Sequence, residues 1–134
     1  MAKTTKKSTR RAEQPEVAVA CVSNVYMRMM TFKKKGDVEL GHKHPYDHAS
    51  LLSAGSLRVE VEGERKDFKA PAVIFIRANA QHQLSALANN TIITCIHALR
   101  VGERVDDILP PDAVISGKDR ERLIGALRAL EPAA

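Results

Sequence analysis

Apolar and polar residues alternate along much of the chain between residues 16 and 99. The clearest example is residues 57–62, where Leu and Val occupy the odd-numbered positions and charged residues occupy the even ones. Successive side chains of a strand point to opposite faces, so this pattern predicts a strand with one buried and one solvated face. Similar reasoning predicts β structure over residues 16–33, 49–52, 72–76, 83–88 and 91–99.

Turn-forming residues separate the predicted strands. Gly36 lies in a lysine-rich turn, and Gly55 follows the short apolar segment 49–52. Asn89-Asn90 lies between two apolar stretches and indicates a hairpin, because Asn tolerates the backbone conformations of tight turns. Short strands at intervals of about eight to twelve residues are typical of an all-β sandwich or barrel, which is the fold class that we expect.

Residues 110–134 have a different pattern. Pro110-Pro111 ends the β alternation, and Ser116 precedes a segment with helical spacing of apolar residues. Ser is a preferred N-cap, and Asp119, three residues later, fits a capping box. We therefore predict a helix over residues 117–130 that packs on the outside of the β structure or on a partner. Its apolar stripe consists of Leu123, Ile124, Leu127 and Leu130.

The positive charge of the chain is concentrated at its N-terminus. The formal net charge is +5, from 21 Lys and Arg residues against 16 Asp and Glu residues. The first twelve residues contain five Lys and Arg residues and no acidic residue, so the remainder is neutral. We predict a flexible, disordered basic tail over residues 1–15. Nucleic acid is not an expected partner except through this tail.

Length and composition exclude several classes of protein. A chain of 134 residues suits one domain, and its 44% of apolar residues is enough for a hydrophobic core. No apolar run approaches the roughly 18–20 residues of a membrane helix, and none follows the basic N-terminus as in a secretory signal. Cys21 and Cys95 are too few for a disulfide framework. We therefore expect a cytoplasmic protein with no membrane contact.

Three of the five histidines lie within seven residues. His42 and His44 are two positions apart, so on an extended chain they point to the same face. His48 follows after a predicted turn, and His82 opens a later strand. Imidazole is the commonest metal ligand among side chains. The four histidines therefore predict a metal site, with a solvated polar loop as the alternative.

The spacing around these histidines resembles the first motif of the cupin superfamily, G-x5-H-x-H-x3,4-E-x6-G. The motif positions are occupied by Gly36, His42, His44, His48 and Gly55. Every spacing fits, and the one departure is His48, which stands where the family usually has Glu.

Residues 76–82 resemble a degenerate second cupin motif, P-x-G-x2-H. Arg77 stands at the usual Pro and Asn79 at the usual Gly, whereas His82 keeps the metal-binding position. Asn tolerates the left-handed backbone that Gly adopts readily. The resemblance as a whole spans residues 17–100.

The resemblance implies an antiparallel, jelly-roll-like cupin barrel over residues 16–109, followed by a helical segment over 110–134. Cupins are usually dimeric, so it also implies a homodimer. It further implies one divalent transition metal, which can be Fe, Mn, Ni, Cu or Zn because all of these accept imidazole. Because a histidine replaces the usual Glu, the site has either four histidine ligands or three without His48. The implied ligands are His42, His44, His48 and His82.

Two functions remain open at this point. The first is an enzyme acting on a small anionic or enolisable molecule, since neutral imidazoles leave the charge of a divalent ion uncompensated. Dioxygenase-type oxidative cleavage is the favoured reaction, with His97 or Tyr46 moving a proton and Arg77 binding a carboxylate. Each residue also has a structural alternative. His97 is then a histidine of the barrel interior whose hydrogen bonds are all made, and Arg77 is a surface residue. The second function is a non-catalytic module that binds a metal or a small-molecule ligand.

Overall fold

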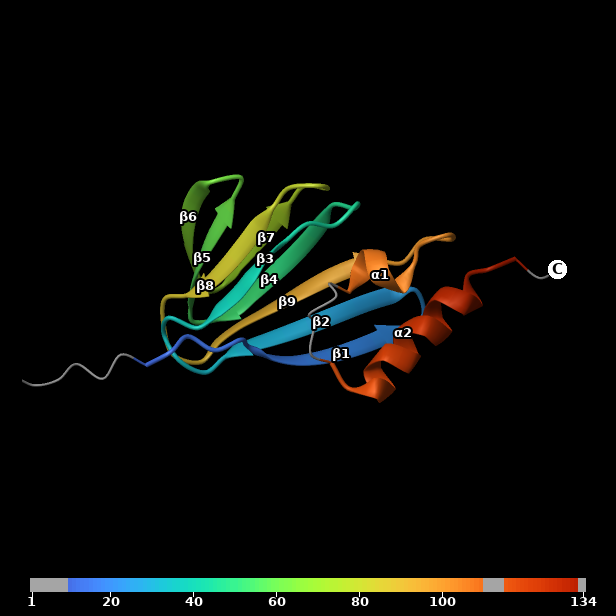
Figure 1. The fold of residues 1–134 in the computed structure, drawn as a ribbon, viewed down its shortest axis with the longest axis horizontal. Coiled ribbons are helices and arrows are strands. Elements are labelled where there is room, and N and C mark those ends of the chain that lie inside the picture. Colours follow the sequence, from blue (N-terminus) through green and yellow to red (C-terminus); the bar gives the residue numbers. More distant parts are fainter. Residues whose placement is uncertain (1–9, 110–114, 133–134) are drawn as a thin grey trace, which may run out of the picture.

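A computed structural model describes residues 10–109 and 115–132. Within these ranges the chain forms nine strands and two helices, which Figure 1 shows. The strands are β1 (Glu16–Val22), β2 (Val25–Phe32), β3 (Val38–His42), β4 (His48–Ala54), β5 (Ser56–Val61), β6 (Glu64–Lys69), β7 (Ala72–Ile76), β8 (His82–Ala86) and β9 (Thr91–Ala98). The helices are α1 (Val105–Ile108) and α2 (Gly117–Ala129).

The strands form two antiparallel sheets. One has five strands in the order β1-β2-β9-β4-β7, and the other has four in the order β3-β8-β5-β6. Residues of both sheets meet in one hydrophobic core, in which Phe32, Leu52, Leu57 and Ile93 are completely buried. The expected all-β, antiparallel fold class is therefore confirmed. Closure of the two sheets into a barrel stays a prediction.

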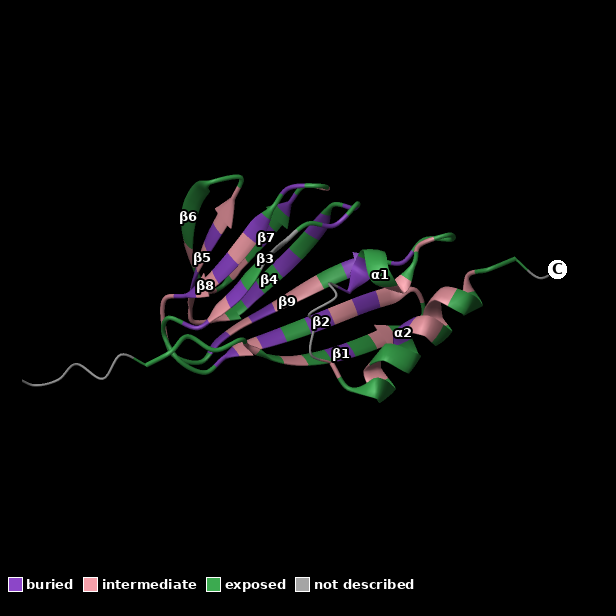
Figure 2. Ribbon diagram, in the orientation of Figure 1, coloured by how far each residue is buried: buried purple, intermediate pink, exposed green. Residues whose placement is uncertain are grey.

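The alternation that predicted a strand over residues 57–62 is realised in β5. Leu57 and Val59 are buried, and their register partners in β8 are Ala86 and Leu84, which are also buried. Figure 2 shows the same banding of buried and exposed residues along most strands of both sheets. One face of each such strand therefore contributes to the core, as the sequence pattern predicts.

Some elements differ from the sequence pattern. The segment 16–33 is two strands, because Ser23 adopts a left-handed backbone with a φ of +53° and β1 and β2 pair around it. The pattern also does not reveal β3, β6 or α1. Strand β6 lies at the edge of its sheet and is polar at nearly every position, so it has no apolar alternation to detect.

Helix α2 begins and ends close to the predicted positions. The hydroxyl of Ser116 accepts a hydrogen bond of 3.1 Å from the backbone N–H of Asp119, which confirms the N-cap. Leu123 is completely buried and packs with Val19 of β1 and Leu99 in a second apolar cluster. The helix thus covers the outer edge of the five-stranded sheet, as Figure 1 shows.

The described part of the N-terminal segment is tied to the body. Arg10 donates to Asp37 at 2.7 Å, and the backbone N–H of Val38 donates to the carbonyl of Glu13 at 3.0 Å. Residues 1–9 of the predicted tail and Pro110-Pro111 lie outside the described ranges. The proposed boundaries at residues 15 and 109 therefore stay predictions. Among the described residues, no helix is both long and apolar enough to span a bilayer.

Candidate metal centre

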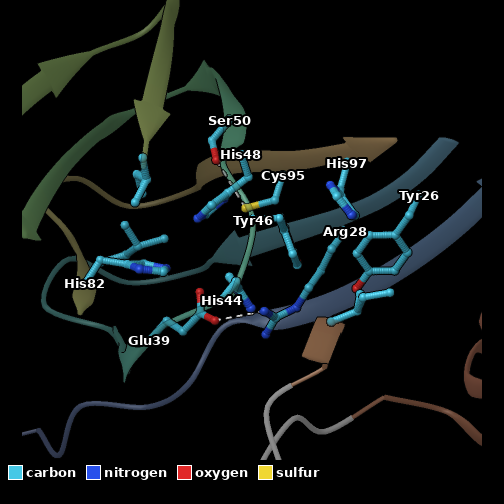
Figure 3. Close-up of a pocket in the computed structure, with 13 residues that line it drawn as sticks. Tyr26, Arg28, Glu39, His44, Tyr46, His48, Ser50, His82, Cys95 and His97 are labelled. Atoms are coloured by element: carbon cyan, nitrogen blue, oxygen red, sulfur yellow. Dashed lines mark hydrogen bonds and ion pairs between the residues drawn. The ribbon is translucent and has the colours of Figure 1, made fainter. Parts of the chain in front are cut away.

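Three histidines from separate segments converge on one point. His44 lies in the loop after β3, His48 is the first residue of β4, and His82 is the first residue of β8. One ring nitrogen from each lies within 4.8 Å of the others, and all three side chains are buried. Figure 3 shows the three rings around a common space. This is the arrangement that the histidine spacing in the sequence predicts.

The ring of His82 is held by its own loop. Its Nδ1 lies 3.0 Å from the carbonyl oxygen of Ala80. A carbonyl only accepts, so Nδ1 carries a proton, and in the neutral ring Nε2 is the nitrogen with the lone pair. A histidine held in this way presents a metal-binding nitrogen in a fixed orientation.

Two hydrogen bonds join the loop that carries His44 to the loop that precedes His82. The N–H of Asn79 donates to the His44 carbonyl at 2.6 Å, and the N–H of Ala78 donates to the Asp47 carboxylate at 2.7 Å. Asn79 has a φ of +59°, which is the left-handed conformation expected at this Gly position of the motif. The backbone conformation at Asn79 therefore helps to bring the two motifs together.

His42 is the last residue of β3, and its backbone pairs in register with His82 of β8. Its side chain lies outside the described part of the structure. Its role as a fourth ligand therefore stays a prediction. The three histidines that the structure does bring together are His44, His48 and His82.

Tyr46 and His97 lie beside the histidine cluster. The Tyr46 ring stacks on His97, with 3.7 Å between the centroids, and on His44, with 4.8 Å between the centroids. His97 also contacts an acid, because its Nε2 lies 2.8 Å from the carboxylate of Glu103. Tyr46 thus connects the metal-ligand candidate His44 to a histidine that a carboxylate orients.

Burial determines the protonation state of the tyrosine. Loss of solvent raises the pKa of the Tyr46 phenol well above its usual value, and the nearby Tyr26 phenol adds to the shift. At neutral pH Tyr46 is therefore a hydrogen-bond donor and not a base. Of the two residues predicted to move protons, His97 is the one that can accept a proton.

The structure also places two groups that sequence reasoning missed. Arg28 of β2 and Glu39 of β3 form a buried ion pair of 3.0 Å that bridges the two sheets. The sequence did contain a signal for Arg28. It lies two residues from both Tyr26 and Met30, so in a strand it points to the same buried face as they do. A charged residue on an apolar face is unusual and points to a function or a partner.

The predicted carboxylate-binding residue lies elsewhere. Arg77 is exposed in the loop after β7 and lines a shallow surface depression with Glu62 and Phe75. It is not among the residues that line the cavity at the histidines. The proposal that Arg77 binds a substrate carboxylate is therefore not supported by a position beside the histidine cluster.

The histidine cluster borders a small cavity of about 20 Å³. That volume holds roughly one water-sized atom. Arg28, Tyr26, Tyr46 and His97 line the same cavity, and Ile108 of α1 closes one side. Figure 3 shows Tyr26, Arg28, Tyr46 and His97 gathered beside the histidines; Tyr26 and Arg28 come from β2, His97 from β9 and Tyr46 from the loop after β3.

Comparison with solved structures identifies the fold. A cupin superfamily protein from Desulfitobacterium hafniense has a TM-score of 0.57 at 15% identity, covering 67% of this chain and 82% of its own. KdgF from Halomonas sp. has a TM-score of 0.57 at 21% identity, covering 77% of this chain and 91% of its own. An RmlC-like cupin from Desulfovibrio desulfuricans has a TM-score of 0.57 at 15% identity, covering 74% and 98%.

The chain has the cupin fold. The resemblance seen in the two sequence motifs is thus confirmed in three dimensions. At identities of 21% and below, these similarities concern the fold alone. No family model and no curated protein matches the sequence.

The donor set at this site suits a transition metal. Two ligand atoms bound at about 2.1 Å to one ion can be at most about 4.2 Å apart. The cluster spans up to 4.8 Å, so small rotations of the rings bring the three nitrogens to coordinating distance. Three imidazoles without a carboxylate favour Fe, Ni, Cu or Zn over Mg or Ca and do not select one of them.

Proposed function

We propose that this cupin binds one divalent transition metal through His44, His48 and His82, with His42 as a fourth ligand. The observation that carries the proposal is the convergence of three buried imidazoles from separate segments to within 4.8 Å. Imidazole nitrogens are the commonest side-chain ligands of divalent transition metals, and this cluster offers three of them at one point. The hydrogen bond from His82 to Ala80 supports the same role.

We further propose that the bound ion serves catalysis on a small anionic or enolisable molecule. Imidazole ligands are neutral, so the ion would keep its full charge and polarise oxygen atoms of a substrate. The favoured reaction is of the dioxygenase type, in which both atoms of O₂ enter the products of the cleaved substrate. The structural similarity to KdgF, at 21% identity, supports the fold only and does not select a reaction.

The protein's own groups have distinct roles in this proposal. His97, oriented by Glu103, accepts a proton from the substrate, and Tyr46 donates a hydrogen bond while staying protonated. Ile108 contributes an apolar side chain to the lining of the cavity. These roles rest on the stacking of Tyr46 with both His44 and His97.

Elemental analysis of untagged protein tests the metal site. We expect close to one ion per chain, and a loss of at least about tenfold in His82→Ala and in His42→Ala. His48→Glu restores the usual family ligand, so it should retain the metal. His97→Ala is the matched control, because this histidine lies outside the ligand set, and it should also retain the metal. Full occupancy in His82→Ala contradicts the assignment.

Oxygen uptake tests the reaction class. Iron-loaded protein should consume O₂ with at least one member of a panel of β-diketones and phenolic acids. His97→Ala should lose this activity while keeping its metal content. Metal-loaded protein that consumes no oxygen with any member argues against the dioxygenase proposal and leaves metal binding intact.

The alternative function is a non-catalytic metal-binding module. The small volume of the cavity, about 20 Å³, favours it because a substrate does not fit without movement of surrounding side chains. An ion that is structural should lower the melting temperature strongly when a chelator removes it. An ion that is catalytic should affect activity more than stability.

We also propose a homodimer, as the cupin resemblance implies, in a cytoplasmic protein. The outer face of the five-stranded sheet supports the dimer, since Val73 and Phe75 of β7 are 73% and 68% exposed. Leu51 pairs with Val73 in register and extends this face. Light scattering after size exclusion should give a dimer mass, and Phe75→Lys a monomer. Val101→Lys, at an exposed apolar residue in the loop after β9, should stay dimeric.

A further inference from the structure

Two buried donors in the cavity have no partner among the described residues. They are Nε of Arg28 and the phenol oxygen of Tyr26. Both side chains line the same small cavity as His44, His48 and His82. A buried donor without an acceptor is unfavourable, and it is satisfied when a water, an anion or another acceptor enters the cavity.

The Arg28 guanidinium is held in place. Its Nη1 contacts the Glu39 carboxylate at 3.0 Å, and the Arg28 side chain is only 8% exposed. This ion pair fixes the plane of the guanidinium across the gap between the sheets. The Nε atom has no partner among the described residues, and Arg28 lines the same cavity as His44, which Figure 3 shows in close-up.

The charge of the cavity favours an anion once an ion is bound. Among the described lining residues, Glu39 is the one acid, and Arg28 neutralises it. Three neutral imidazoles would leave the two positive charges of a divalent ion without compensation. An anionic group that reaches the ion would therefore gain both from the metal charge and from the donors on Arg28 and Tyr26.

We propose that Arg28 and Tyr26 form a subsite for the carboxylate of a small ligand, next to the histidine cluster. The inference deepens the proposed function and rests on it, because it names the chemical group that the metal cupin recognises. The cavity of about 20 Å³ has room for roughly one water-sized group, so the side chains around it must move to admit even a small carboxylate. In this proposal Arg28, and not Arg77, binds the carboxylate.

Three variants test the subsite. Arg28→Lys keeps the positive charge opposite Glu39 and removes the Nε–H donor. Tyr26→Phe removes only the hydroxyl, and it should fold because loss of an unpartnered buried hydroxyl costs little. Arg58→Lys is the matched control, since Arg58 is also a strand arginine whose Nε is bonded, at 2.8 Å, to Asp67 on the exposed hairpin.

The probe is sodium formate at constant ionic strength, measured by calorimetry and by the shift in melting temperature. Wild-type protein loaded with Zn²⁺ should bind formate. Its affinity should fall by about tenfold or more in Arg28→Lys and by a smaller factor in Tyr26→Phe, in line with the loss of charge-assisted hydrogen bonds. Arg58→Lys should bind formate like the wild type.

The outcomes separate the subsite from the metal site. Zn²⁺ binding with equal formate affinity in wild type, Arg28→Lys and Tyr26→Phe overturns the subsite and leaves the metal proposal standing. The same conclusion follows if loaded wild-type protein binds no formate. If Zn²⁺ does not bind, the metal proposal fails, and formate binding is then measured on the metal-free protein. Formate binding that Arg28→Lys weakens supports the subsite. Any other result overturns the subsite. If Arg28→Lys does not fold, Tyr26→Phe decides alone.

Discussion

Asp47 accepts a hydrogen bond of 2.7 Å from the backbone N–H of Ala78, and this contact joins the loop of the first histidine motif to the loop of the second. Neither residue is a metal-ligand candidate. A second hydrogen bond, from the backbone N–H of Asn79 to the His44 carbonyl, joins the same two loops, so they are held together at two points. The relative position of His44 and His82 depends on these bonds.

Asp47→Ala should therefore weaken metal binding more than it weakens the fold. Loss of the Ala78 contact allows the two loops to separate, and the cluster loses part of its preorganisation. We expect a fall of about tenfold in metal affinity, as is common when groups that orient ligands are removed. Asp67→Ala, which removes an exposed pair with Arg58, is the control and should bind metal normally. Equal affinities in the two variants would mean that the loop contact is unimportant.

The histidine cluster could be predicted because its information is local. His44 lies in a short loop, and His48 and His82 are the first residues of their strands, so all three stand where the β pattern places strand ends. Two strand ends of an antiparallel sandwich lie near each other whenever their strands pair, and β3 and β8 do pair. The motif spacing therefore determined most of the site.

The Arg28–Glu39 pair and the contact of His97 with Glu103 could not be predicted in this way. Arg28 and Glu39 lie on different sheets, so their contact depends on how the sheets pack and not on any repeat within a strand. Glu103 lies in an irregular loop after β9, where no periodicity exists. Such contacts follow from tertiary packing alone.

Gly55, the last residue of the first motif, has a structural role. Its φ is +79°, and a Cβ at this position would lie 2.8 Å from the Cα of Thr91, which is backbone and cannot move aside. Gly55→Ala should therefore lower the melting temperature by several degrees, because both the backbone conformation and the space are unsuitable. Gly63→Ala is the matched control with φ +83° and open space, so its effect should be smaller. Thermal unfolding followed by circular dichroism checks both variants.

The Arg10–Asp37 pair makes stability depend on pH in the acid range. The Arg10 guanidinium, with two backbone N–H donors, holds the pKa of the buried Asp37 carboxyl below its usual value. A lowered pKa in the folded state stabilises the protein above the unfolded-state pKa of about 3.9, and this contribution is lost as the pH falls through the folded-state value. Urea unfolding of wild type and Asp37→Asn should therefore give a difference that is constant near neutral pH and shrinks below about pH 4.

Arg10→Ala provides a second test of the same pair and of the predicted tail. It should lower stability at neutral pH, whereas deletion of residues 1–9 should leave it unchanged. A difference between wild type and Asp37→Asn that grows on acidification would contradict the assigned direction of the Asp37 shift.

Cys95 should be the less reactive of the two cysteines. As a whole residue it is partly buried, but its thiol lines the small cavity, and burial raises its pKa to about 11 in spite of the hydrogen bond from Ser50. The thiolate is the reactive form, so at pH 8 only about one thiol in a thousand is ionised. Burial also raises the pKa of Cys21, which lies at the edge of the sheet under α2. Titration with a disulfide reagent at pH 8 should therefore modify Cys21 first, and Cys95 only after unfolding. Cys21→Ser isolates the slow phase, and rapid modification of Cys95 in that variant would show that the cavity opens readily to solvent.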